Sequence, residues 1–250
     1  MKISTIKNSI AVFVSFLTML VIWKAISIGL NSEIILPSPE AVLKEVILIV
    51  QSSDFLPTVF ATVMRAVFAF IFACISGIII GIITGFSKFA DLIAKPILLA
   101  IMSTPIISLI LLALIWFKSN NVPIVATFLI TFPIITTNVS EGIKNIDNGL
   151  IDMAKIYRIS HRRILAEIYF PSIASYLTAA ISTAVGLGWK VVVTAEVLSQ
   201  PQLAIGTSLQ NSKIYLETAR VLAWTFIAVM LSFIFEVLIR TMEKRIIKWR

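Results

Sequence analysis

Six long runs of apolar residues constrain this chain more than any other feature of its sequence. Each run is close to or longer than the ~20 residues that a helix needs to cross a bilayer. Over the whole chain 58% of the residues are hydrophobic and 14% are charged, whereas a soluble domain carries about 25% charged residues. We therefore expect an all-α, polytopic membrane protein with about six transmembrane helices. The predicted spans are Ile10–Leu30, Pro57–Phe86, Leu92–Phe117, Val122–Val139, Ser172–Leu198 and Thr218–Ile239.

The rest of the composition disfavours several other classes of protein. A transmembrane β-barrel is disfavoured because barrel strands alternate in hydropathy, whereas these apolar runs are unbroken. The single cysteine, Cys74, allows no disulfide framework and no thiolate metal site within one chain, and no metal site is expected. The net charge of +8 is explained by basic cytoplasmic loops, so no nucleic acid partner is expected. The chain is expected to form one transmembrane domain over residues 1–250.

The positions of the basic residues predict an orientation in the membrane. With six spans, both termini lie on the same side as the loop between the fourth and fifth spans. Most of the 21 Lys and Arg residues lie on that side, and an excess of positive charge marks the cytoplasm. Both termini are therefore expected to be cytoplasmic. The residues that decide this are Lys2, Lys7, Lys88, Lys95, Lys144, Lys155, Arg158, Arg162, Arg163, Arg240, Lys244, Arg245, Lys248 and Arg250.

A polar segment, residues 141–171, separates the fourth span from the fifth. It is rich in Lys and Arg and holds the only histidine of the chain, so it must lie in water or against another protein. Its apolar residues predict two short helices, Asp147–Ile159 and His161–Phe170. The Ser160 hydroxyl is expected to cap the second helix, and Pro171 to begin the next span. The segment predicts a cytoplasmic helical hairpin; composition alone leaves an ordinary solvated loop open.

The spacing within this segment resembles the EAA loop of ABC importer permeases. The pattern of that loop is EAA, three residues, glycine, nine residues, then Ile-x-Leu-Pro. On this chain Asp152, Met153 and Ala154 take the EAA positions, and Arg158 takes the glycine position. The resemblance assigns ATPase coupling to a set of residues that includes the neighbours of the motif. They are Asp152, Met153, Ala154, Tyr157, Arg158, Ile159, Ser160, Ile168 and Pro171.

Arginine at the glycine position is the main departure from the family pattern. Glycine adopts a left-handed turn without steric cost, whereas arginine disfavours that conformation. We therefore expect either that the bend of the hairpin shifts, or that an acidic residue of the partner holds Arg158.

The resemblance extends to the nitrate, sulfonate, taurine and thiamine-precursor permeases. It rests on the LPSPE segment, on the run from Thr58 to Phe70 that contains Arg65, on the glycine-rich stretch that ends at Ser87, on Pro105, and on residues 184–206. It implies a type I ABC importer permease-like bundle in the inner membrane of a prokaryote, forming the path for a small solute of that kind, or a riboflavin-like one. The implied partners are a cytoplasmic ATPase dimer, a second permease copy and an external binding protein.

The chain is expected to be a transport subunit and not an enzyme. It contains no GxxxxGK[ST] phosphate loop, so ATP and Mg²⁺ are expected on the partner ATPase and no cofactor on this chain. A self-contained secondary carrier or channel is the alternative, although such a carrier typically shows more intramembrane acids and an internal repeat.

Polar residues within the spans are candidates for the translocation path. Lys24 and Arg65 lie near the outer face and are expected to snorkel. Lys190 lies deep in the fifth span and is six residues before Glu196, so the two do not share a helix face and are not expected to pair. Lys190 either lines the path and favours an anionic substrate, or forms a structural pair with a neighbouring span. The candidate path residues are Ser103, Thr104, Pro105, Lys190 and Glu196.

Three other local features have structural expectations. Ser103, Thr104 and Pro105 are expected to break the third span near its middle, exposing carbonyls to a cavity or only kinking the helix. Gly77, Gly81 and Gly85 are expected to form a face for close helix packing. In the outer segment, a short helix from Glu40 to Val50 is expected to begin at Ser38 or Pro39.

Overall fold

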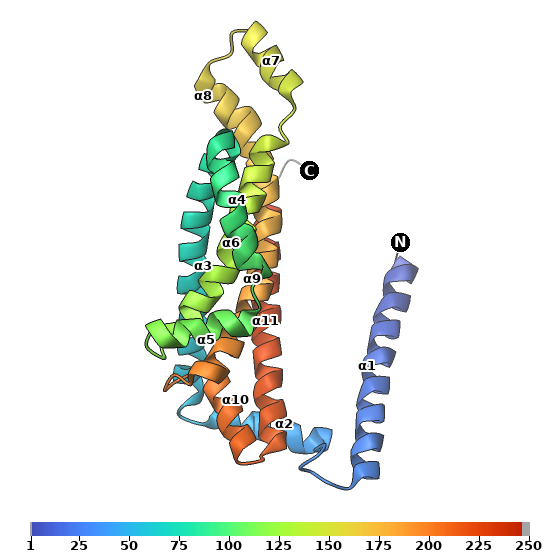
Figure 1. The fold of residues 1–250 in the computed structure, drawn as a ribbon. Coiled ribbons are helices and arrows are strands. Elements are labelled where there is room, and N and C mark those ends of the chain that lie inside the picture. The colour runs from blue at the N-terminus through green and yellow to red at the C-terminus, as the bar shows by residue number, and fades with distance from the viewer. Residues whose placement is uncertain (1, 247–250) are drawn as a thin grey trace.

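A computed structural model describes residues 2–246, without the side chains of residues 2–13, 16, 240 and 242–246. Residues 2–246 contain helices and no β-strand (Figure 1), so the predicted all-α class is confirmed. The helices are α1 (Lys2–Leu30), α2 (Pro39–Gln51), α3 (Phe55–Phe86), α4 (Lys88–Ser103), α5 (Ile106–Trp116), α6 (Val122–Lys144), α7 (Asn148–Ile156), α8 (His161–Ile164), the π-helix η1 (Leu165–Tyr169), α9 (Phe170–Ser199), α10 (Ile205–Ile214) and α11 (Thr218–Ile246).

The described residues contain four helical segments that are long and apolar enough to cross a bilayer. The four are Phe55–Phe86, Val122–Lys144, His161–Ser199 and Thr218–Ile239, and the bent pair α4 and α5 makes a fifth if it counts as one span. A polytopic membrane protein is thus confirmed, whereas the number six is not. The first predicted span contributes a shorter apolar helical segment, Leu17–Leu30.

Helix α6 forms the centre of the bundle and packs most extensively against α3 and α9. The three glycines of α3 make its contact with α6 possible. A Cβ atom at Gly77 would lie 2.9 Å from Cβ of Ile135, and one at Gly81 would lie 2.7 Å from Cβ of Val139. Because real Cβ atoms do not approach so closely, only glycine allows this helix spacing. The predicted packing role of the glycine face is confirmed.

The third predicted span is broken rather than continuous. Helix α4 ends at Ser103 and α5 begins at Ile106, with a bend of 100° between them. Pro105 lacks an N–H group, and Thr104 before it takes an extended conformation with ψ 130°, which is the preference of a residue that precedes proline. The helix therefore ends at this point. The Thr104 hydroxyl donates to the Ala100 carbonyl at 2.7 Å, which satisfies one carbonyl at the break. The expected break is therefore confirmed.

Helix α2 lies at one end of the bundle and joins it to α1, which stands beside the other helices (Figure 1). Ser38 caps α2 by accepting a hydrogen bond from the Ala41 N–H, and Pro39 occupies its first turn, as the sequence predicts. Lys24 on α1 contacts Glu40 on α2 at 2.8 Å. This hydrogen bond lowers the pKa of Glu40 below its ordinary value.

The two ends of the bundle differ in structure. The hairpin of α7 and α8 projects from one end, and α2 and α10 lie at the other (Figure 1). The polar segment and the outer segment of the sequence therefore lie at opposite ends. Of the charges used to predict orientation, those of Lys2, Lys7, Arg240, Lys244, Arg245, Lys248 and Arg250 lie outside the described side chains.

Candidate functional site

The first helix of the hairpin, α7, has a defined start and a defined end. Asp147 caps its N-terminus by accepting a hydrogen bond of 2.8 Å from the Gly149 N–H. At its C-terminus the Ile159 N–H donates to the Ala154 carbonyl at 2.9 Å, and the Arg158 N–H donates to the Lys155 carbonyl at 3.0 Å. These two bonds are those of a Schellman motif, which reverses the chain toward α8.

Arg158 itself supplies the left-handed residue of this motif. Its φ is +53°, so it adopts the conformation that a glycine at this position would adopt. The expectation that the bend shifts because of Arg158 is wrong. The structure shows an exposed Arg158 side chain, while the expected acidic partner of Arg158 on the ATPase stays a prediction.

The tip of the hairpin exposes apolar side chains outside the bundle. Ile156 is 79% exposed and Tyr157 is 75% exposed, and Leu150 and Met153 are exposed as well. Asp152 forms an exposed ion pair with Lys155 at 3.1 Å. Because the hairpin projects from the end of the bundle (Figure 1), its exposed apolar tip is a candidate docking surface.

The structure brings the predicted coupling residues together, but it does not expose all of them. Ala154 is fully buried within the chain, where its carbonyl closes the turn. Ile159, Ile168 and Pro171 are half-buried. Direct contact with a partner is open to the exposed members, which are Asp152, Met153, Tyr157, Arg158 and Ser160.

The second half of the hairpin differs from prediction in two respects. Ser160 is the N-cap residue of α8, but its side chain makes no capping hydrogen bond, so the predicted hydroxyl cap is wrong. The helix also does not end before Pro171: α8, η1 and α9 run on as one helical segment of 39 residues, His161–Ser199. A widened turn precedes the proline, with the Phe170 N–H donating to the Leu165 carbonyl. This turn accommodates a ring that clashes with a regular α-helix.

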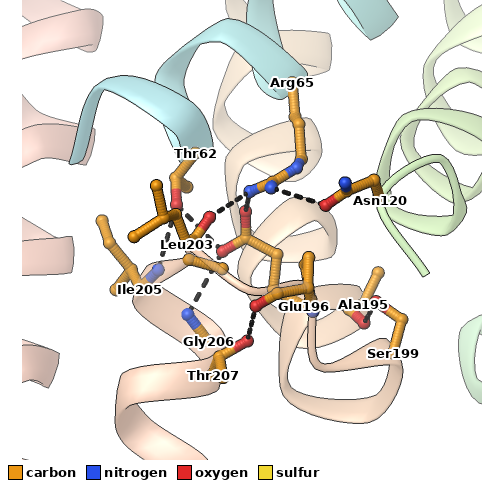
Figure 2. Close-up of polar contacts among 12 residues, drawn as sticks. Thr62, Arg65, Asn120, Ala195, Glu196, Ser199, Leu203, Ile205, Gly206 and Thr207 are labelled. Carbon is orange, nitrogen blue, oxygen red and sulfur yellow. Dashed lines mark hydrogen bonds and ion pairs between the residues drawn. The ribbon is translucent and has the colours of Figure 1, made fainter. Parts of the chain in front are cut away.

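Glu196 is the centre of a buried polar network at the opposite end of the same helix (Figure 2). Its side chain is completely buried, and one carboxylate oxygen accepts a hydrogen bond from Arg65 on α3 at 2.8 Å. The other oxygen accepts from the Thr62 hydroxyl at 3.1 Å and from the Gly206 N–H at 3.2 Å. The burial of a carboxylate is compensated by a charged partner and several donors.

Arg65 links this network to two further segments of the chain. It donates to the Leu203 carbonyl at 2.8 Å and to the Asn120 side chain at 3.1 Å (Figure 2). The predicted snorkelling of Arg65 is wrong, because the residue is only 9% exposed and is held by these contacts. The sequence analysis also did not identify Thr62 and Asn120 as members of this network. One signal for the ion pair was available: Arg65 and Glu196, a base and an acid, lie near the ends of two predicted spans that face the same side of the membrane.

Lys190 lies on a different face of α9 from Glu196, as expected. It is exposed and lines a groove of about 470 Å³ between α9 and α11. The acidic residue Glu236 lines the same groove, together with Trp189, Thr194, Leu209 and Phe233. No salt bridge joins Lys190 to an acidic side chain within the described part of the chain. Of the other candidate path residues, Ser103 and Pro105 are exposed at the break between α4 and α5, and Thr104 is half-buried.

Comparison with known proteins identifies relatives over most of the chain. A putative aliphatic sulfonates transport permease, SsuC, of Escherichia coli (strain K12) is 29% identical over 232 residues, which cover 91% of this chain and 87% of the relative. The SsuC protein of Bacillus subtilis (strain 168) is 23% identical over 234 residues, 92% of this chain and 83% of the relative. The taurine transport permease TauC of Escherichia coli (strain K12) is 25% identical over 233 residues, 91% and 84% respectively.

The family model of the binding-protein-dependent transport system inner membrane component matches residues 77–248. This match includes the hairpin, the Lys190 groove and Glu196, and it extends over more than half of the chain. The chain therefore belongs to this family and is a transmembrane permease of an ABC importer.

Proposed function

We propose that the hairpin formed by α7 and α8 couples this permease to a cytoplasmic ABC ATPase. The observation that carries the proposal is the apolar tip, in which Ile156 and Tyr157 are exposed beyond the end of the bundle. Membership in a binding-protein-dependent family implies an ATPase and a substrate-binding protein as partners. ATP and Mg²⁺ belong to the ATPase in this proposal, and the hairpin end with both termini faces the cytoplasm.

The coupling proposal is tested by co-purification of the chain with a co-expressed ATPase. Tyr157→Ala removes a large exposed side chain from the tip and is expected to lower the amount of bound ATPase at least about tenfold, as for a hot-spot residue. Tyr215→Ala is the matched control, since Tyr215 is also 75% exposed but follows α10, which lies at the opposite end of the bundle (Figure 1). Equal retention of the ATPase by both variants contradicts the proposal.

We also propose that a second copy of the chain packs against α9. A row of small and polar residues on this span is exposed: Ser175, Ala179, Thr183, Gly186 and Lys190. Ser, Thr and Lys are unfavourable toward lipid, and small residues favour close helix contact. A symmetric dimer covers this row and encloses a polar path between the two copies.

The solute is proposed to be a small molecule with a sulfonate group, since the relatives are named for the transport of aliphatic sulfonates or taurine. Lys190 supplies positive charge to the path in the C-terminal third of α9. Lys190→Gln is expected to reduce uptake of a radiolabelled sulfonate while ATPase binding is kept. Loss of the assembled complex would instead assign Lys190 a structural role.

Uptake by the reconstituted chain without any ATPase would reject the coupling proposal.

A further inference from the structure

Helix α10 lies at one end of the groove that contains Lys190. The groove runs between α9 and α11, and Leu209 is the residue of α10 among those that line it. Helix α10 lies at the end of the bundle opposite to the hairpin (Figure 1). Leu209 also packs against the cluster that contains Trp189 and Trp224. Helix α10 therefore borders the groove, through Leu209, at the end that is distant from the hairpin.

The sequence of α10 provides little to hold it in this position. The helix has ten residues, IGTSLQNSKI, of which only Ile205, Gly206 and Ser212 are buried. A helix of this length is marginal by itself. Its N-cap residue, Ala204, has no side chain that can accept a hydrogen bond, so the N–H groups of the first turn need acceptors from elsewhere.

Side chains from α3 and α9 supply these acceptors. The Ile205 N–H donates to the Thr62 hydroxyl at 3.0 Å, and the Gly206 N–H donates to the Glu196 carboxylate at 3.2 Å (Figure 2). Arg65 holds the preceding residue through the Leu203 carbonyl at 2.8 Å. The α10 N-terminus is thus capped by two residues from other helices. Thr62 of α3 lies more than a hundred positions away in the chain, and Glu196 lies near the end of the preceding helix, α9.

The approach of α10 to α9 leaves no space for a side chain at Gly206. A Cβ atom there would lie 2.5 Å from Cβ of Glu196 and 2.5 Å from the backbone nitrogen of Val197. The position of α10 is therefore fixed by close contact as well as by hydrogen bonds. Movement of α10 away from α9 breaks the bonds to Thr62, Arg65 and Glu196 and separates a buried ion pair from its supporting donors.

We infer that Thr62, Arg65 and Glu196 are positioning residues for transport, which hold α10 over the outer end of the Lys190 groove and keep that end closed to the outer aqueous phase. The inference rests on the proposed function, because it takes the groove as part of the path, its exposed side with Lys190 and Thr194 as covered by the second copy, and the α10 end as the outer end. Opening of the groove then requires that α10 leave its caps.

The inference is tested by the accessibility of a cysteine inside the groove. Thr194→Cys is introduced in a Cys74→Ser background, so that the reporter is the only thiol, and the permease is co-expressed with its ATPase. Intact cells are treated with a membrane-impermeant maleimide, and the rate of labelling is measured. Thr62→Val removes the acceptor for Ile205 and is expected to raise this rate about tenfold, as local opening becomes easier.

Matched variants separate closure from general destabilisation. Thr62→Ser keeps the hydroxyl and is expected to restore the slow rate. Gly206→Ala leaves the three positioning side chains intact but displaces α10, and is expected to accelerate labelling in the same way. Lys24→Gln breaks an exposed ion pair that also measures 2.8 Å and lies at the same end, and it is expected to leave the rate unchanged.

Two results would overturn the inference. One is a wild-type labelling rate in both Thr62→Val and Gly206→Ala when the complex with the ATPase is assembled. The other is failure of Tyr215→Cys, in the same background, to react from outside, which places α10 on the cytoplasmic side and rejects the proposed orientation as well. If Tyr215→Cys reacts from outside but Thr62→Val and Gly206→Ala leave the labelling rate of the reporter unchanged, the proposed function stands. The closure by α10 is then rejected.

Discussion

At the scale of single residues, Arg158 shows how a local preference is overruled by hydrogen bonds. A left-handed conformation costs an L-residue roughly 1–2 kcal/mol. Two backbone hydrogen bonds of the Schellman motif, at 2.9 and 3.0 Å, contribute about 0.5–1.5 kcal/mol each. The two terms are of similar size, so the turn forms although arginine stands where the EAA-loop pattern has glycine.

This balance predicts different outcomes for two substitutions of Arg158. Arg158→Gly relieves the strain at φ +53° and is expected to keep the turn and the bound ATPase, with a stability change within about 1 kcal/mol. Arg158→Val places a β-branched residue in the same conformation, where it is strongly disfavoured, and is expected to weaken ATPase binding. Co-purification and thermal unfolding in detergent measure both effects. A valine variant that binds the ATPase as well as the glycine variant would contradict this account.

At the scale of helices, the sequence predicted the elements better than their connections. Apolar run length located four of the six predicted spans, and Pro105 located the break between α4 and α5, because these features act through local geometry. The same local reasoning failed at Arg65 and at Pro171. The fate of Arg65 depends on Glu196, which lies 131 positions away, and a widened turn carries the helix through the proline. Neither a distant partner nor a π-turn has a signal in local periodicity.

The packing of α3 against α6 predicts a strong difference between two glycines. Gly81→Ala would place a Cβ atom 2.7 Å from Cβ of Val139 and 2.9 Å from the Thr136 carbonyl oxygen. This overpacking is expected to lower stability by about 1–3 kcal/mol. Gly29→Ala is the control, since a Cβ atom at this position of α1 meets nothing within 4 Å. Thermal unfolding of the purified variants measures the difference, and similar midpoints for both would refute the close contact.

At the scale of the whole molecule, the exposed row of residues on α9 predicts the arrangement of two copies. Gly186→Cys and Thr183→Cys, each in a Cys74→Ser background, are expected to form cross-links between copies in membranes under mild oxidation. Ile79→Cys is the control, because Ile79 is exposed on α3 away from this row. Cross-linking is read as a band of twice the mass on a non-reducing gel. Equal cross-linking at positions 79 and 186 would argue against α9 as the dimer contact.

The uninterrupted segment His161–Ser199 has a mechanical consequence. Its 39 residues form a lever arm about 58 Å long at 1.5 Å per residue. A tilt of about 5° around its midpoint displaces each end by about 2.5 Å, in opposite directions, by the same geometry. That displacement is close to the length of the hydrogen bonds between Glu196 and its donors, which measure 2.8 to 3.2 Å. A tilt of the hairpin by a few degrees is thus sufficient to strain the hydrogen bonds of Glu196 at the far end of the segment.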